Sequence, residues 1–83
     1  MAVSNELARY GVLVNAVSPG FVLTDLTRKN LSAKERKDIA AQVPMGRLAT
    51  PADISPVVLF LASHCNTYLT GKNIVVDGGF IDV

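Results

Sequence analysis

The stretch NAVSPGFVLTDL, residues 15–26, decides how this chain of 83 residues is organised. An apolar run that ends at Val17 meets a Ser-Pro-Gly breaker, and a second apolar patch then leads to Thr24 and Asp25. Because proline fixes the chain direction and glycine leaves the backbone bare, a buried strand is expected to end here. A hydroxyl and a carboxylate therefore follow the end of a strand within a few residues.

The flanking sequence places this turn between helices and a second strand. The run VLVNAV, residues 12–17, is rich in β-branched side chains and predicts a strand that is covered on both faces. NIVVDGG, residues 73–79, predicts a second short strand that ends at a glycine pair. The first residues predict the end of a helix that is closed by Gly11. An S-x-x-E capping box opens a polar helix over residues 32–43.

A third helix is predicted to begin at Thr50 and to continue through SPVVLFLAS. Thr50 is suited to the N-cap, Pro51 to the first helical position, and Asp53 to the positive end of the helix dipole. Pro56 lies deeper in the helix and predicts a kink or a displaced start. Its apolar arc is wider than one sheet face requires, which predicts burial on more than one side. The stripe expected to cover the sheet comprises Ile54, Val57, Val58 and Leu61.

The composition bounds the class of protein. Hydrophobic residues make up 49% of the chain and charged residues 18%, which excludes disorder and suits an α/β interior. The net charge of +1 is too balanced to indicate nucleic acid or a membrane surface as a partner. No apolar run reaches the length of a membrane span. The lone Cys65 is expected to be a small buried residue, and a reducing, cytoplasmic compartment is predicted.

Together these elements predict an α/β fold in the order helix, strand, helix, helix, strand. Because helical segments separate the two strands, the strands are expected to be parallel and joined by a right-handed crossover. Two parallel strands do not make a stable sheet by themselves. Residues 1–83 are therefore expected to form a single partial domain that is covered by further protein.

Three segments in order resemble the C-terminal third of a short-chain dehydrogenase/reductase: NELARYGVLVNAVSPGFVLTDL, PMGRLATPADISPVVLFLAS and TGKNIVVDGGF. They are most similar in style to the 3-oxoacyl-acyl-carrier-protein reductases. The resemblance implies the C-terminal part of a Rossmann-like doubly wound fold, with two parallel strands and about three helices. It also implies NAD or NADP as the cofactor.

By this resemblance, the Pro-Gly turn lies beside the nicotinamide, at the strand end where open α/β sheets place ligands. Pro19 would fix the chain direction, and Gly20 would let the backbone pass close to the cofactor. The backbone of Val22 would hydrogen-bond the nicotinamide carboxamide. The hydroxyl of Thr24 would contact the carboxamide or the pyrophosphate. The alternatives are a plain turn after a strand and a local cap at Thr24, and a local cap is also the interpretation for Asp25.

The family's proton-transfer residues have no counterpart in this sequence, and neither does its G-x-x-x-G-x-G phosphate turn. No catalytic residue and no metal ligand is therefore assigned. Tyr68 and Lys72 fit the spacing of the family's Y-x-x-x-K motif. However, they lie in a loop, and Gly71 disfavours the helix that would bring the lysine beside the tyrosine. The match is interpreted as coincidental, and the chain alone is expected to have no turnover.

Two functions from different classes follow. The first is part of an NAD(P)-dependent oxidoreductase that transfers hydride between the nicotinamide and a small-molecule carbonyl or secondary alcohol. The chain would supply the nicotinamide-side loop, the substrate lid and the oligomer interface. The second is a non-catalytic oligomerisation or interaction module from a truncated reading frame. In either case, the expected protein partner is a second copy or the missing N-terminal part of the fold.

The lid would include a basic stretch, which is interpreted as a solvated helix face. The alternative is a docking surface for an acidic carrier or a phosphorylated substrate. Its cations are Arg28, Lys29, Lys34, Arg36 and Lys37.

Overall fold

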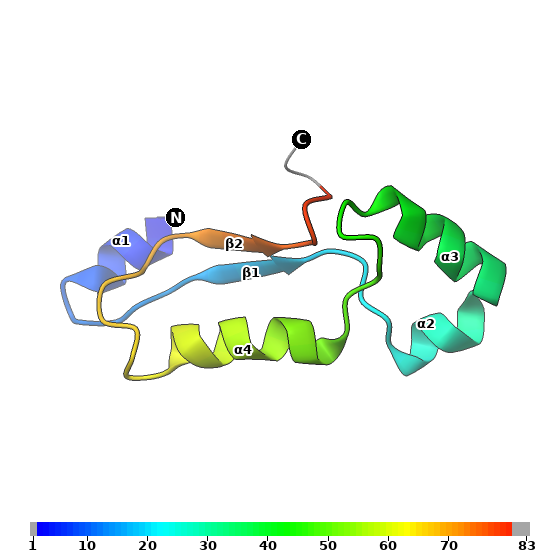
Figure 1. Ribbon diagram of the computed structural model, residues 1–83. Coiled ribbons are helices and arrows are strands. Elements are labelled where there is room, and N and C mark those ends of the chain that lie inside the picture. The colour runs from blue at the N-terminus through cyan, green and yellow to red at the C-terminus, as the bar shows by residue number, and fades with distance from the viewer. Residues whose placement is uncertain (1, 81–83) are drawn as a thin grey trace.

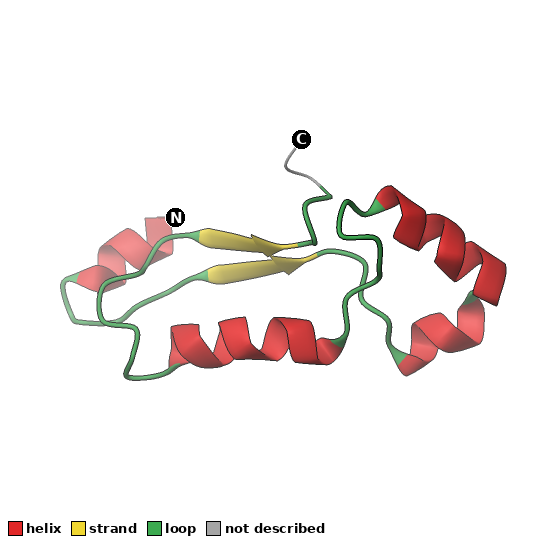
Figure 2. Cartoon of the chain, in the orientation of Figure 1, coloured by secondary structure: helices red, strands yellow, loops and turns green. Residues whose placement is uncertain are grey.

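The computed structural model describes residues 2–80 as four helices and two short strands (Figures 1 and 2). The α/β class and the pair of strands agree with the sequence. The helix count exceeds the expected three because a short helix follows Thr24. The elements are α1 Ala2–Ala8, β1 Ala16–Pro19, α2 Asp25–Asn30, α3 Ala33–Gln42, α4 Pro51–Ala62 and β2 Asn73–Val76.

The two strands pair in parallel, as the sequence predicts. The register sets Ala16 opposite Asn73 and Pro19 opposite Val76. Helix α4 runs back alongside the strands, while α2 and α3 lie beyond their carboxyl ends (Figure 1). The chain thus makes a β-α-β crossover from which residues 25–48, termed the excursion below, project at one end.

The strand bounds were wrong by several residues. The predicted strand at 12–17 begins only at Ala16, because side-chain hydrogen bonds interrupt the main-chain pairing before this residue. The Thr70 hydroxyl accepts from the Val14 N–H at 2.9 Å, and the Asn15 amide oxygen accepts from the Lys72 N–H at 3.1 Å. The strand at 73–79 ends at Val76, since the following residues form a turn with two glycines at positive φ.

The predicted helix signals at 32–35 and 50–53 are confirmed. Glu35 Oε1 accepts from the Ser32 N–H at 3.1 Å, and Ser32 Oγ accepts from the Glu35 N–H at 3.1 Å. Asp53 Oδ2 accepts from the Thr50 N–H at 2.7 Å. Helix α4 begins directly at Pro51 and continues past Pro56, so its start is not displaced. Gly11 adopts a φ of 75°, as expected for the turn after α1.

The described chain has almost no apolar core of its own. Val43, 6% exposed, is the only fully buried apolar side chain among residues 3–80. The radius of gyration is 15.7 Å, against about 12 Å for a compact chain of this length. The accessible surface is 6092 Å², which is about 1,300 Å² more than a compact monomer of this mass exposes. These elements are therefore arranged as an open layer.

Three burial predictions were wrong. The first strand was expected to be covered on both faces, yet Ala16 and Pro19 of β1 are exposed, because only α4 among the described helices runs along the strands (Figure 2). In the stripe on α4, Ile54, Val57 and Leu61 are half-buried, but Val58 is 46% exposed. Cys65, expected to be buried, is exposed in the loop after α4. Within residues 2–80, no helix has the length and apolar character that crossing a membrane requires.

Candidate functional site

The candidate site lies at the carboxyl ends of β1 and β2, where the chain leaves the sheet. Residues 19–24, termed the rim below, turn from the end of β1 into α2. The Gly20 N–H donates to the Val76 carbonyl at 3.0 Å, so the two chains are still joined at the start of the turn. Open parallel sheets bind ligands at this end of their strands. The structure thus brings the four residues assigned from the sequence to the expected edge.

Close packing against Asp77 explains why a glycine occupies position 20. A Cβ at this position would lie 2.9 Å from both Cα and Cβ of Asp77. Since ordinary carbon–carbon contacts are about 3.5–4.0 Å, no side chain fits here without moving the end of β2. The bare backbone at Gly20 therefore lets the two strand ends approach each other, whatever else lies beside it.

Val22 is held by main-chain hydrogen bonds on one side only. It forms an isolated parallel bridge with Ala49, in which the Ala49 N–H donates to the Phe21 carbonyl at 2.8 Å and the Leu23 N–H donates to the Ala49 carbonyl at 2.7 Å. In a parallel bridge of this kind, the N–H and C=O of the bridging residue point away from the partner. The Val22 carbonyl accepts from the Thr27 hydroxyl at 3.3 Å, whereas the N–H of this half-buried residue has no hydrogen-bond partner among residues 2–80.

Thr24 caps helix α2. Its Oγ1 accepts from the Thr27 N–H at 3.2 Å and lies 3.0 Å from the Thr27 hydroxyl. Asp25 follows in the first turn, where a carboxylate suits the helix dipole. The structure thus shows the local-cap interpretation of Thr24 directly. Because the Thr27 hydroxyl donates its proton to the Val22 carbonyl, the Thr24 hydroxyl donates to Thr27 Oγ1, and one lone pair of Thr24 Oγ1 remains for a further contact.

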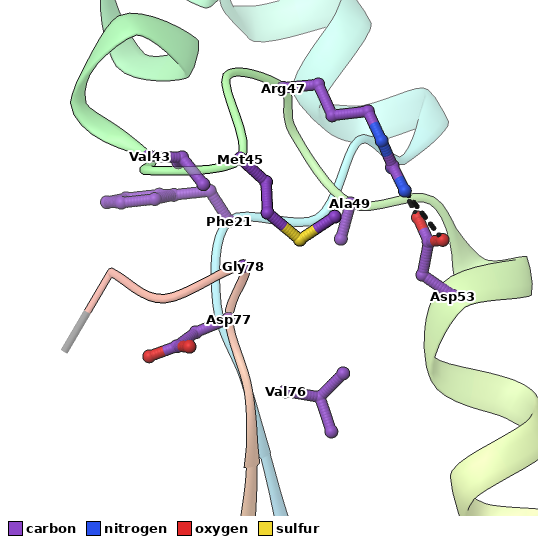
Figure 3. A pocket seen from close by; sticks show the side chains of 9 residues that line it. All are labelled: Phe21, Val43, Met45, Arg47, Ala49, Asp53, Val76, Asp77 and Gly78. Atoms are coloured by element: carbon purple, nitrogen blue, oxygen red, sulfur yellow. Dashed lines mark hydrogen bonds and ion pairs between the residues drawn. The ribbon is translucent and has the colours of Figure 1, made fainter. Parts of the chain in front are cut away.

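An ion pair that the sequence analysis missed joins the end of the excursion to the first turn of α4. Arg47 Nη1 and Nη2 donate to Asp53 Oδ2 and Oδ1 at 2.7 Å and 3.0 Å, in a two-point contact (Figure 3). These hydrogen bonds from Arg47, followed by the Thr50 N–H, hold the pKa of the Asp53 carboxyl well below its ordinary value of 3.8. Asp53 was identified as a helix-start residue, but no periodicity marks a loop arginine six residues before it.

A small cavity of about 180 Å³ lies beside the rim, between the end of β2 and the return of the excursion (Figure 3). This volume is below the about 300–1,000 Å³ typical of ligand pockets. Phe21 is the one rim residue that lines it, whereas the four residues assigned to the cofactor from the sequence, Pro19, Gly20, Val22 and Thr24, do not. The residues that line it are Phe21, Val43, Met45, Arg47, Ala49, Asp53, Val76, Asp77 and Gly78.

The Tyr68–Lys72 pair lies at the opposite end of the strands. Lys72 directly precedes β2, and its carbonyl accepts from the Ala16 N–H at 2.9 Å. The Tyr68 side chain is 96% exposed, and Gly71 adopts a φ of 75°. The two side chains are therefore not on a helix and do not face the rim. This location agrees with the coincidental match inferred from the sequence.

The chain has two parallel strands that a crossover helix connects, and open sheets of this kind bind ligands at the carboxyl ends of their strands. This arrangement is that of a Rossmann-like α/β protein. The family model described as enoyl-(acyl carrier protein) reductase matches residues 2–81. The chain therefore belongs to this family, within the short-chain dehydrogenases/reductases. The resemblance drawn from the sequence is confirmed.

Curated relatives agree with this assignment. The chain is 43% identical over 82 residues to the 3-oxoacyl-(acyl-carrier-protein) reductase FabG of Rickettsia felis, covering 99% of this chain and 34% of the relative. It is 46% identical over 78 residues to the enzyme of that name from Salmonella typhimurium, covering 94% of this chain and 32% of the relative. The chain thus spans about a third of the length of the curated relatives that it matches.

Solved structures have the same arrangement of elements. ElxO with NADP bound superposes with a TM-score of 0.91 at 31% identity, over 99% of this chain and 34% of that one. YwfH, an NADPH-dependent reductase involved in bacilysin biosynthesis, superposes with a TM-score of 0.87 at 31% identity, over 99% of this chain and 35% of that one. The open arrangement of the described elements therefore occurs within larger folded reductases.

Proposed function

We propose that this chain forms the nicotinamide-side part of an NAD(P)-dependent oxidoreductase, within a single domain that residues 1–83 fill only partly. The reaction is hydride transfer between the nicotinamide and a carbonyl or secondary alcohol of a small molecule. The rim holds the nicotinamide, the excursion is the substrate lid, and α4 contributes to subunit contacts. A cytoplasmic location belongs to the same proposal.

The observation that carries this proposal is the N–H of Val22, which has no hydrogen-bond partner in the described part of the chain. A main-chain donor that a bound molecule covers needs an acceptor, and the carboxamide oxygen of nicotinamide is a suitable one. The bridge to Ala49 fixes the direction of this N–H. A ring held through its carboxamide would present one face to the substrate. The residues present therefore fit the cofactor.

The other rim residues support the same role. Pro19 ends the strand and Gly20 brings the strand ends together, so the position of Val22 relative to the sheet is fixed. Thr24 contributes its hydroxyl to the carboxamide or pyrophosphate while it caps α2. When bound, the cofactor supplies or accepts the hydride. ElxO has NADP bound and YwfH is NADPH-dependent, which favours NADP over NAD as the first cofactor to test.

The proton-transfer step is assigned to residues outside this sequence. No tyrosine in the described chain lies at the rim, since Tyr68 is at the other end of the strands and Tyr10 follows α1. The 83-residue chain alone is therefore expected to have no turnover.

The exposed surface supports association with further protein. Leu59 and Phe60 on α4 are 67% and 47% exposed. The surface excess of about 1,300 Å² is larger than the about 800 Å² that one partner buries in a standard interface. A second copy or the remaining part of the reductase fold would cover these side chains. Family membership favours the oxidoreductase over a non-catalytic module, although both predict association.

The proposal is tested by titrating the ¹⁵N-labelled chain with nicotinamide mononucleotide and following amide chemical shifts. We expect a saturable shift at Val22 and little change at Gly71, which lies at the opposite end of the strands. No shift at Val22, or equal shifts at both amides, would contradict the assignment. In parallel, the purified chain is mixed with NADPH and acetoacetyl-N-acetylcysteamine. Oxidation of NADPH above background would refute the expected lack of turnover.

A further inference from the structure

We propose that the Arg47–Asp53 ion pair is a positioning element that directs the Val22 N–H toward the nicotinamide. This inference rests on the proposed function of the rim. Neither side chain needs to touch the cofactor, since both act through the main chain of residues 48–50. The proposal assigns a role to a two-point ion pair that lies outside the rim.

Asp53 joins three partners at the start of α4. One carboxylate oxygen accepts from Arg47 Nη1 at 2.7 Å and from the Thr50 N–H at 2.7 Å. The Thr50 hydroxyl donates to the same oxygen at 3.1 Å. Arg47 Nη1 also donates to the Leu48 carbonyl at 3.2 Å. The carboxylate and the guanidinium thus hold the backbone on both sides of Ala49.

Ala49 connects residues 48–50 to the rim. Its N–H and carbonyl are both bonded to the rim backbone, at Phe21 and Leu23, with distances of 2.8 Å and 2.7 Å. The bond to the Phe21 carbonyl fixes the peptide before Val22, and the bond from the Leu23 N–H fixes the peptide after it. When residues 48–50 are held, the Val22 N–H is directed away from Ala49. When they are released, the Val22 peptide can rotate.

The remaining anchors of the excursion do not hold Ala49. The Met45 N–H donates to the Gly78 carbonyl at 3.1 Å, and the Gly46 N–H donates to the Val43 carbonyl at 2.7 Å. These bonds fix the chain before Arg47 only. The ion pair is therefore the described contact that ties the return of the excursion to the first turn of α4 (Figure 3).

A second ion pair in the same excursion provides a matched control. Lys34 Nζ lies 3.8 Å from Asp38 Oδ2, with both side chains mostly exposed. Exposed pairs of this kind contribute little, whereas a two-point Arg–carboxylate contact is directional. The same Asp→Asn change can therefore be made at a pair that touches the main chain of the site and at one that does not.

The test compares D53N with D38N in the 83-residue chain, by amide hydrogen exchange and by titration with nicotinamide mononucleotide. For D53N we expect amide exchange at Leu23 and Ala49 to accelerate about tenfold or more, since charge-assisted hydrogen bonds are lost. The affinity read at the Val22 amide should fall several-fold. D38N should change neither quantity, and R47K should act in the same direction as D53N but more weakly.

Two results would overturn the inference. One is a D53N chain that exchanges and binds like D38N. The other is equal acceleration at the Gly20 amide, which bonds Val76 in the sheet, because this would indicate general unfolding. If nicotinamide mononucleotide shifts no amide of the unsubstituted chain, the proposed function of the rim fails. Exchange at Leu23 then still reports whether the ion pair orders the rim, so the two failures are distinguishable.

Discussion

Gly20→Ala tests the close approach of the two strand ends. The new Cβ would lie 2.9 Å from Cα and Cβ of Asp77, at least about 0.6 Å closer than carbon atoms normally approach. Overpacking of this kind costs about 1–3 kcal/mol, and the reduced freedom of the unfolded chain returns about 0.4–1 kcal/mol. Since Gly20 has no positive φ, backbone strain adds nothing. The expected net loss is about 1–2 kcal/mol.

The assay is urea denaturation at one fixed protein concentration, together with exchange of the residue 20 amide. We expect a lower free energy of unfolding and faster exchange at this amide, because its bond to the Val76 carbonyl is displaced. Gly46→Ala is the comparison, since Gly46 has a φ of 82° and open space around it. That variant should lose stability through backbone strain while the residue 20 amide stays protected. An unchanged stability of Gly20→Ala would refute the reasoning.

Three further outcomes are expected. Because hydrogen bonds from Arg47 lower the pKa of Asp53 below its ordinary value of 3.8, the ion pair's stabilisation is full above about pH 4. It is lost as the pH falls further, so amide exchange at Leu23, corrected for intrinsic rates, should accelerate there; pH-independent protection would contradict this. Ser32→Ala removes one cap bond of α3 and should cost about 0.5–2 kcal/mol in urea denaturation. Ser55→Ala, which removes a hydroxyl bond to a carbonyl within α4, should be nearly neutral, and equal losses would argue against a capping effect. In light scattering the chain should exceed its monomer mass of 8.8 kDa, and Leu59→Glu should reduce that mass; a monodisperse monomer would count against a contact surface on α4.

Sequence reasoning succeeded where one local rule dominates. The helix starts at Ser32 and Thr50 follow from short-range side-chain bonds to the backbone, which depend on spacing alone. The parallel pairing follows from the helical connection between two short strands. The sequence also identified the rim as the segment that leaves β1, because a Pro-Gly pair interrupts the apolar run there.

The failures concern features that depend on distant partners. The start of β1 moved to Ala16 because Thr70 and Asn15 side chains, more than fifty residues apart from their partners, replace main-chain pairing. Helix α2 is too short to show a period and is held by Thr24. The partner of Asp53 could not be predicted, since Arg47 reaches it from an irregular loop. The exposure of Cys65 depends on what surrounds a loop, which periodicity does not report.

The most direct test is a crystal structure of the protein that contains this chain, grown with NADP⁺. The account predicts that the carboxamide oxygen lies about 2.7–3.2 Å from the Val22 nitrogen, with the nicotinamide beside the rim. A nicotinamide bound at the opposite ends of the strands, near Tyr68 and Lys72, would contradict it. So would a bound cofactor that leaves the Val22 N–H facing another acceptor.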